Sequence, residues 1–405
     1  MSEDASEEKV ELQSARRGRV DPHLSIKHYD PEADMMLLHF GPQHPSTHGV
    51  FRMDLHLDGE VVIKATPYLG FLHRAVEKLC EKLTYVQQTP IVDKNDYVAP
   101  MTNEQALNMA FEKIMNVEVP RRAKWLRVLL AELQRIASHL VALGTFTLDL
   151  GGALGGGSTL FLHCFREREM VLDLFEELTG ARFHYNTHTI GGNRHDLPPG
   201  FDKKVRAVLD EIELRIPDYA RMSVDNAIFR ARTEGVGILD GELALELGIT
   251  GPNLRGSGVD HDLRRDAPYA AYDELVPKVI VERGGDCWAR TKVRFDEVAE
   301  SIRLCRLALD GMPEGPINGY KAVRQPTQAK VAGGQVYVGI ETPRGELGTF
   351  LIGGGDTPTA PYRLKIRSPS LHALSAIPYI LPGFTVSDAV AILGSLDPIM
   401  GEVDR

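Results

Sequence analysis

The sequence has few cysteines, and none is spaced as metal ligands usually are. The four in 405 residues are Cys80, Cys164, Cys287 and Cys305. No two form a Cys-x-x-Cys pair, the spacing typical of zinc and iron–sulphur sites. A disulfide framework is not indicated, because such frameworks belong to short, cysteine-dense secreted chains. The simplest interpretation is a protein of a reducing compartment that binds no metal or cluster itself.

Long apolar runs and an excess of positive charge are also missing. No run of about 18 or more apolar residues is present, so no transmembrane helix is predicted. Residues 1–11 are acidic and have no apolar core, unlike a secretory signal or a transit peptide. The formal net charge is −10, which argues against a nucleic-acid partner. Any attachment to a membrane is therefore expected to depend on partner proteins.

Two common nucleotide and nucleophile motifs are absent as well. The sequence contains neither a phosphate-binding glycine loop of Walker type nor a Gly-x-Ser-x-Gly elbow. The glycine clusters at 333–334 and 353–355 have the wrong spacing for a dinucleotide fingerprint. We therefore expect that the chain does not bind NAD itself.

What is present is an ordinary globular composition, with 43% hydrophobic and 25% charged residues, enough for a large core. Residues 1–33 are polar and predict an arm outside the core. Residues 51–57 alternate between apolar and polar side chains, and Val61, Ile63 and Ala65 continue the odd-numbered apolar face. The intervening Asp58-Gly59 suits a type I′ turn, so a β-hairpin is predicted.

The middle of the chain has helical periodicity and the end returns to strands. Apolar spacing predicts helices over residues 102–116, 121–146, 160–178, 199–215 and 294–309, with Gly180 as a C-cap. Alternation at 336–340 and 364–366 predicts strands, and a short helix is predicted near 386–393. The expected fold class is α+β, a central helical bundle with small antiparallel sheets at its ends.

The most unusual stretch is Gly-Pro-Gln-His-Pro-Ser-Thr-His-Gly at residues 41–49, immediately before the predicted hairpin. Proline and glycine impose an unusual backbone path, and such a loop can present His44 and His48 to a cavity. Alternatively, the histidines only cap the ends of strands. The residues alone leave both interpretations open.

Several other polar residues have a structural and a functional interpretation. Tyr97 can donate a hydrogen bond and a proton in a pocket, or pack half-buried. Arg74 and Glu77 fit an ordinary surface helix with ion pairs, and His184 is a lone histidine, which is more often structural. For these residues the structural interpretation is favoured by the sequence alone.

A charged row lies within the helix predicted over 121–146. Glu132, Arg135 and His139 recur at spacings of three and four and therefore share one face. Such a row beside an apolar stripe is usually solvated. Because Asp149 and a glycine cluster follow the helix, part of the row could instead meet a pocket.

Taken together, long motifs resemble the D-type subunit family of NADH-quinone oxidoreductase, respiratory complex I. They are GPQHPSTHGVFR at 41–52, HRAVEKL at 73–79, ELQRIASHLVALGT at 132–145, FREREMVLDLFEELTGARFH at 165–184, TGPNLRGSGVDHDLRRDAPY at 250–269, ETPRGELG at 341–348 and LDPIMGEVDR at 396–405. The resemblance covers nearly everything from residue 36 onward.

That family is similar in turn to nickel–iron hydrogenase large subunits. The resemblance implies one hydrogenase-large-subunit-like domain over 34–405. Its expected parts are a β-hairpin region at 34–68, a helical core at 69–325 and an α/β part at 326–405. The thiolate pairs of hydrogenases are absent here, at 96–99 and at 397–401. Because the metal site needs such soft ligands, hydrogenase activity is excluded and the vacated pocket is expected to take a quinone head group.

The resemblance also implies roles for individual residues. His48 and Tyr97 would hydrogen-bond the two quinone oxygens, ubiquinone or menaquinone. Asp149 would pair with His48 and supply or relay a proton. Arg74 and His184 would lie near the terminal iron–sulphur cluster, which belongs to a partner protein of the complex.

The implied partners are the cluster-bearing B-type subunit, the C-type and I-type peripheral subunits and the H-type membrane subunit. The NAD site lies elsewhere in that complex. Electrons from NADH would reach the quinone, and the charge change around His48 and Asp149 would be coupled to proton translocation. The expected location is the cytoplasmic side of a bacterial inner membrane, as a peripheral subunit.

Two departures and two alternatives accompany this interpretation. The stretch after Asp149 carries extra glycines, and His188 stands close to where the family has an arginine before Gly191-Gly192. His188 is therefore a candidate to replace that positive charge. The same pocket would also suit a complex fed by ferredoxin or reduced F420, and a non-catalytic scaffold subunit is the second alternative.

Overall fold

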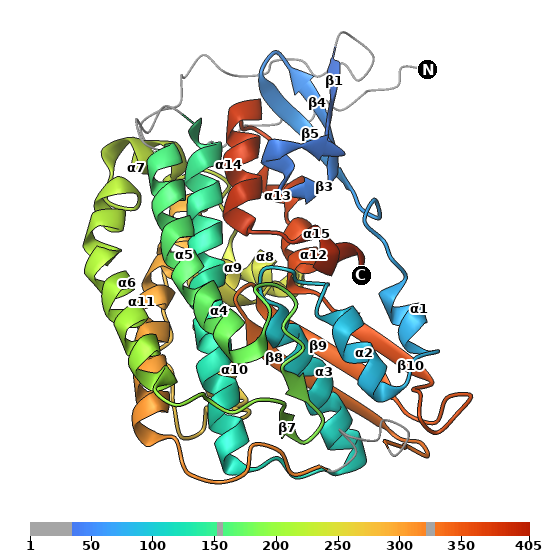
Figure 1. Ribbon diagram of the computed structural model, residues 1–405. Coiled ribbons are helices and arrows are strands. Elements are labelled where there is room, and N and C mark those ends of the chain that lie inside the picture. Colours follow the sequence, from blue (N-terminus) through green and yellow to red (C-terminus); the bar gives the residue numbers. More distant parts are fainter. Residues whose placement is uncertain (1–34, 152–156, 321–328) are drawn as a thin grey trace.

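The computed structural model describes residues 35–151, 157–320 and 329–405. The arm expected over residues 1–33 and the glycine-rich stretch at 152–156 lie outside the described residues. Helices run side by side through one half of the molecule, and small antiparallel sheets lie at the other side (Figure 1). This arrangement confirms the predicted α+β fold class.

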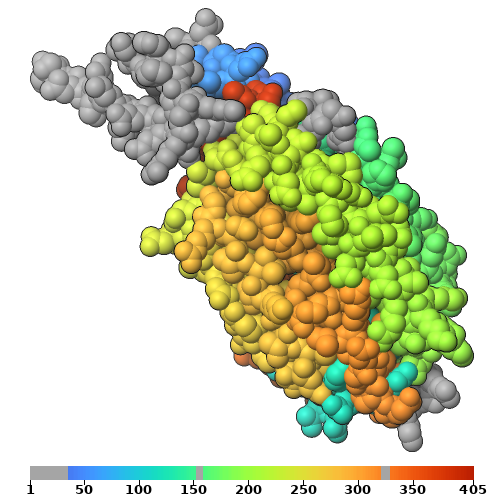
Figure 2. Space-filling view, turned by 90° about the vertical axis from the view of Figure 1, so that its left-hand side faces the viewer, coloured from blue at the N-terminus to red at the C-terminus, as the bar shows by residue number. Residues whose placement is uncertain are grey.

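The helical bundle is built around α4, Arg121–Asp149. Helices α5, Gly157–Thr179, and α11, Cys287–Gly311, both pack along it. Helix α6, Phe201–Met222, packs on α5 and α11 from outside, and Figure 2 shows α6 and α11 lining the outer face. Helix α4 is therefore enclosed and nearly all of its central residues are buried.

The predicted helices are confirmed, and two of them extend well beyond a predicted end. The helix predicted over 294–309 begins at Cys287, because Asp286 caps it by accepting a hydrogen bond from the Ala289 N–H at 2.8 Å. The helix predicted to end at residue 215 continues through Pro217 to Met222, since its apolar face stays buried up to Tyr219. Gly180 follows α5 with φ of 79°, as predicted for a C-cap.

The row Glu132, Arg135 and His139 is fully buried, so the expected solvated face is wrong. Glu132 forms ion pairs with Arg264 at 3.1 Å and with Arg135 at 3.2 Å. His139 Nε2 lies 2.8 Å from Glu297 Oε2. Helical spacing shows that residues share a face. The countercharges that make their burial possible come from other segments packed against the helix.

The N-terminal sheet has the order β1-β4-β5, with bounds Met36–Phe40, Arg52–Asp58 and Val61–Tyr68. The predicted hairpin is confirmed as β4 and β5. The prediction of a type I′ turn at Asp58-Gly59 is wrong. The two loop residues are Gly59 and Glu60, and only Gly59 has a positive φ, 59°, whereas a type I′ turn needs two. A bulge between His56 and Leu57 shifts the register, so Val62 and not its odd-numbered neighbours is buried.

The C-terminal sheet has the order β10-β9-β8. Strands β8, Gln335–Thr342, and β9, Gly345–Ile352, form a hairpin, and β10, Arg363–Arg367, pairs with β9. Helix α3, Pro100–Met115, packs on β8 and β9. The predicted strands at 336–340 and 364–366 are thereby confirmed, and the turn between β8 and β9 reaches into the core.

Shorter elements join these parts. They are β2 Gln43–His44, η1 Pro45–Thr47, β3 Gly49–Val50, α1 Val76–Cys80, α2 Tyr85–Val92, β6 His188–Thr189, β7 Gly192–Asn193, α7 Ala227–Thr233, α8 Gly241–Glu246, α9 Gly251–Arg255, α10 Leu263–Asp266, α12 Pro369–Leu374, α13 Ile377–Ile380, α14 Val386–Leu396 and α15 Met400–Asp404. Helices α14 and α15 lie between the bundle and the sheets (Figure 1). Within the described ranges, no helix is both long and apolar enough to cross a bilayer.

Candidate functional site

His48 lies at the end of the short helical turn η1, in the loop that the sequence marks as unusual. Its backbone is left-handed, with φ of 54°. The Thr47 hydroxyl lies 2.7 Å from the His44 carbonyl oxygen and 2.8 Å from that of Gly49, and therefore holds the turn. A side chain at Gly49 would meet Met400 Cγ at 2.9 Å. The loop is thus packed tightly against α15, and His48 is held in a defined orientation.

Asp149 is the last residue of α4, and its Oδ2 contacts His48 Nε2 directly. Both side chains are 12% exposed. Burial by itself lowers the pKa of His48, but the hydrogen bond and the charge of Asp149, together with the charge of Asp397, raise that pKa above its ordinary value. The structure therefore brings these two predicted residues together as an ion pair that favours protonated His48.

Gly394 of α14 lies directly against this pair. A Cβ atom at Gly394 would be 3.2 Å from Asp149 Oδ2 and 3.4 Å from His48 Nε2. Beside Gly394, a narrow cavity of about 10 Å³, room for roughly one water, is lined by Phe146, Arg294 and Asp397 among others. The pair therefore stands at the junction of α4, α14 and the η1 loop.

Tyr97 lies in the segment between α2 and α3 and is partly buried. Its ring is 6.5 Å from the ring of Phe183, centre to centre. Burial raises the pKa of the Tyr97 hydroxyl, which keeps it protonated as a donor; the charge of Arg344 opposes this rise, and the charges of Asp96 and Asp397 add to it. The charge of Asp397 thus acts on both His48 and Tyr97.

Asp397 and Arg344 are functional candidates that sequence reasoning missed. Arg344, in the turn between β8 and β9, contacts Asp96 Oδ2 at 2.6 Å through Nη1, and its Nε is 3.5 Å from Asp397 Oδ2. Asp397 follows α14 with a left-handed backbone, φ of 54°. Both residues stand inside motifs that carry the family resemblance, Arg344 at 341–348 and Asp397 at 396–405, but the sequence alone assigned neither of them a role.

Arg74 and His184 both contact the segment of residues 93–95. Arg74 donates to the carbonyl oxygen of Lys94 at 3.1 Å and to Asn95 Oδ1 at 3.2 Å. His184 Nδ1 lies 3.7 Å from Asp93 Oδ1. Burial lowers the pKa of His184, and the charges of Lys94 and Arg74 lower it further. The structure therefore places these two predicted residues in one neighbourhood, next to the segment that carries Tyr97.

His188 does not replace a positive charge, so that suggestion is wrong. Its side chain is fully buried, and its Nδ1 lies 2.6 Å from Asn193 Oδ1. Burial, with a smaller contribution from the charge of Arg127, lowers the pKa of His188 to about 3. The imidazole is therefore neutral and serves to hold the small β6–β7 hairpin together.

Metal-binding groups are not gathered in the described ranges, where no cluster of three or more His, Cys, Asp or Glu side chains could hold an ion. The four cysteines are free and buried. Burial raises the pKa of the Cys80 and Cys164 thiols to about 12. Such thiols stay protonated and are poor ligands.

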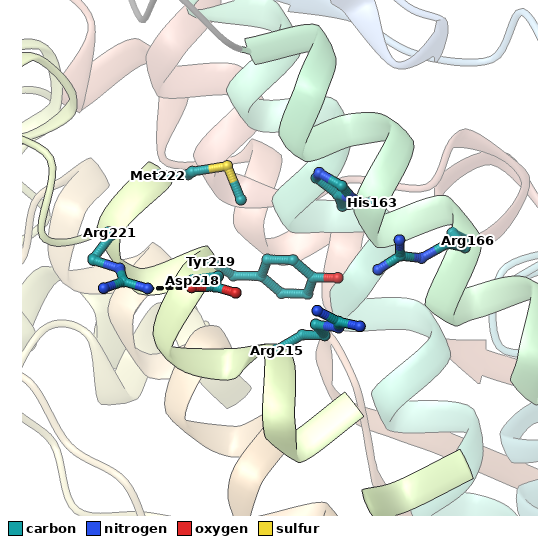
Figure 3. Close-up of a pocket in the computed structure, with 7 residues that line it drawn as sticks. All are labelled: His163, Arg166, Arg215, Asp218, Tyr219, Arg221 and Met222. Carbon is teal, nitrogen blue, oxygen red and sulfur yellow. Dashed lines mark hydrogen bonds and ion pairs between the residues drawn. The ribbon is translucent and has the colours of Figure 1, made fainter. Parts of the chain in front are cut away.

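A separate cavity of about 290 Å³ lies between α5 and α6 (Figure 3). Its lining is rich in arginine, but each guanidinium is already paired with a carboxylate. The pairs are Arg166 with Glu167, Arg215 with Glu211, and Arg221 with Asp218. The cavity is therefore close to neutral, and it contains none of the predicted site residues.

Comparisons with known proteins place the chain among respiratory proteins. Residues 155–332 and 320–405 match the family described as respiratory-chain NADH dehydrogenase, 49 Kd subunit. The second D-type subunit of NADH-quinone oxidoreductase from Rhizobium etli is 44% identical over 396 residues, covering 91% of this chain and 95% of that protein. The D-type subunit from Clostridium beijerinckii is 46% identical over 379 residues, covering 93% of this chain and 100% of that protein. The D-type subunit from Methylacidiphilum infernorum is 44% identical over 398 residues, covering 93% of each chain.

Proposed function

The chain belongs to the 49 kDa subunit family of respiratory-chain NADH dehydrogenases and is a subunit of an oxidoreductase complex; from this premise we propose that it forms the quinone-reducing pocket of that complex. The observation that supports the proposal is the pairing of His48 with Asp149. The charge of Asp397 acts on both His48 and the Tyr97 hydroxyl and so links the pair to Tyr97 electrostatically. Together they offer two proton donors of different acidity.

Reduction of a quinone to a quinol takes up two electrons and two protons. His48 Nε2 is engaged by Asp149, which leaves Nδ1 to donate to one quinone oxygen, while the Tyr97 hydroxyl donates to the other. Donors positioned in a partly buried site stabilise the charge that develops on a substrate oxygen. Loss of the proton from His48 breaks its ion pair with Asp149, and we propose that this change is the event coupled to proton translocation.

The electrons come from a reduced iron–sulphur cluster held by a partner protein. Arg74 and His184, which both contact the segment 93–95, are proposed to face that cluster, where the donor groups of both side chains and the positive charge of Arg74 would adjust its potential. The proposed partners are the B-type subunit as the cluster carrier, the C-type and I-type peripheral subunits, and the H-type membrane subunit. The proposed location is the cytoplasmic side of a bacterial inner membrane.

The test is Tyr97→Phe, measured in the purified complex. The substitution keeps the aromatic contact with Phe183 but removes the hydroxyl. Loss of a positioned proton donor costs about 10²-fold to 10⁴-fold in rate, so quinone reduction should fall by that amount. NADH oxidation with a water-soluble artificial acceptor should be retained, because it does not use this pocket.

A matched control is Tyr362→Phe, since Tyr362 is 66% exposed and lies outside the proposed pocket. It should leave both reactions unchanged. If Tyr97→Phe reduces quinone at the unaltered rate, the assignment of the pocket is wrong, and the scaffold alternative gains support.

A further inference from the structure

Beside Tyr97 lies a buried cluster in which carboxylates outnumber arginines. Asp96, Asp397 and Glu402 are 1%, 5% and 0% exposed, and Arg294 and Arg344 are both 2% exposed. They come from five different parts of the chain: the α2–α3 segment, the end of α14, α15, α11 and the β8–β9 turn. If all were ionised, the cluster would carry one uncompensated negative charge in a site largely shielded from water.

The two arginines lie against the two aspartates. Arg344 contacts Asp96 at 2.6 Å and approaches Asp397 at 3.5 Å. Arg294 Nε lies 3.9 Å from Asp397 Oδ2, and its other nitrogens donate to Asn253 and to the carbonyl oxygens of Ser395 and Leu396. Neither guanidinium makes an ion pair with Glu402.

Glu402 is the member without a cation. Its Oε2 lies 2.5 Å from the hydroxyl of Ser370 on α12, and its buried Oε1 has no hydrogen-bond partner in the part of the chain that the structure describes. The charged groups that act on it are Asp96 and, more weakly, Arg344. Arg74 reaches the carbonyl oxygen of the adjacent Gly401 at 3.5 Å, but among the described residues no ion pair joins Arg74 to these carboxylates.

Burial, with a smaller contribution from the negative charge of Asp96, raises the pKa of Glu402 to about 7. An uncompensated carboxylate in a dry site normally takes up a proton, because an isolated buried charge is too costly. The excess of one carboxylate over the arginines and the raised pKa of Glu402 therefore both indicate that Glu402 binds a proton. At neutral pH the cluster holds a proton that is easily released.

We propose that this cluster stores one proton on Glu402 and that the stored proton replaces the one Tyr97 gives to quinone. The inference rests on the proposed function and deepens it. Asp96 directly precedes Tyr97, and its negative charge raises the pKa of both Tyr97 and Glu402. When the Tyr97 O–H bond breaks, the phenolate takes the proton from Glu402, whose carboxylate is later reprotonated from water. Glu402 is a positioning residue, since it does not touch the substrate.

The test compares Glu402→Gln with the unaltered complex over a range of pH. Glutamine keeps the shape and can still accept from Ser370, but it holds no transferable proton. In the unaltered complex, quinone reduction should decline as pH rises through about 7, because the store empties. Glu402→Gln should reduce quinone at least tenfold more slowly and lose that decline, whereas Glu402→Asp should restore it.

Infrared difference spectra on reduction give a second measurement that does not depend on rate. The band of a protonated carboxyl group should be lost from the spectrum of Glu402→Gln and kept in Glu300→Gln, a control on α11 whose side chain pairs with Arg303. Oxidation of NADH by a water-soluble acceptor verifies assembly of each variant.

The proposal is overturned if Glu402→Gln keeps the pH profile of the unaltered complex, or if its carboxyl band is unchanged. This failure differs from failure of the quinone pocket itself. If only the proton store is wrong, Tyr97→Phe still lowers quinone reduction strongly. If the quinone pocket itself is wrong, Tyr97→Phe has no effect.

Discussion

At the scale of single residues, His48 and Asp149 show how a neighbouring carboxylate favours the protonated form of a buried histidine. Burial alone would favour the neutral imidazole, but the carboxylate at the end of α4 outweighs it. The C-terminal end of a helix also favours a cation. Tyr97 differs, because burial holds its hydroxyl protonated. The site thus pairs a histidine whose pKa is raised by a carboxylate with a tyrosine whose pKa is raised by burial.

Asp149→Asn is expected to move the pH dependence of quinone reduction. The folded pKa of His48 is raised, so the active protonated form persists to higher pH in the unaltered protein. Removing the carboxylate lowers that pKa, and the activity should decline at a lower pH than before. The measurement is the pH profile of quinone reduction in the purified complex.

A suitable control for this variant is Asp173→Asn, on the exposed side of α5, where the side chain is 67% exposed. It should leave the profile unmoved. An Asp149→Asn profile identical to that of the unaltered complex would show that His48 is not the titrating donor.

At the scale of elements, buried ion pairs join helices that apolar contacts alone would leave free to slide. Arg127 on α4 and Glu112 on α3 form a bidentate pair at 2.6 Å and 2.9 Å. Arg127 also donates to the carbonyl oxygens of Thr189 and Gly192. One guanidinium thereby connects α3, α4 and the β6–β7 hairpin.

Glu112→Gln is expected to loosen α3, because it leaves the buried guanidinium of Arg127 without its countercharge. Breaking such a pair costs about 3–5 kcal/mol. Hydrogen exchange in the purified complex should show faster exchange of the amides of α3. Glu211→Gln, which breaks the exposed pair with Arg215 on α6, should change local stability by about 0.3–0.5 kcal/mol. Equal effects of the two substitutions would contradict this account.

At the scale of the whole molecule, the last residues of the chain hold a segment more than 300 positions earlier. Asp404 accepts hydrogen bonds from the backbone N–H groups of Gly70 at 2.8 Å and Leu72 at 2.7 Å. The Arg74 N–H donates to the carbonyl oxygen of Arg405 at 3.2 Å. Helix α15, which carries Glu402, therefore also supports the segment that positions Arg74.

Asp404→Ala is expected to free residues 70–73 without unfolding the core. Each lost hydrogen bond to a charged group is worth about 1.5–3 kcal/mol. Limited proteolysis should then cut this segment faster than in the unaltered protein. Asp58→Ala, at an exposed strand end, should not change cleavage there. An unaltered cleavage rate in Asp404→Ala would show that other contacts hold the segment.

The sequence alone determined the main helices and strands and the outline of the site. Apolar periodicity placed α3, α4 and α5 within a few residues, because these helices bury whole faces whose spacing is visible in the chain. Motif resemblance selected His48, Asp149 and Tyr97. The pairing of the first two now has a geometric basis, whereas the function of all three stays a proposal.

Only the tertiary structure decided which charges are buried and which partners they meet. Glu132 and His139 lie on one face of α4 in either case, but their countercharges come from α10 and α11. Asp96, Arg344 and Asp397 are far apart in the chain, and the excess carboxylate of Glu402 exists only where they converge. The register of β5 and the neutrality of His188 likewise depend on neighbours. Electrostatic energies are set by distance and burial, and neither quantity is written in the order of the residues.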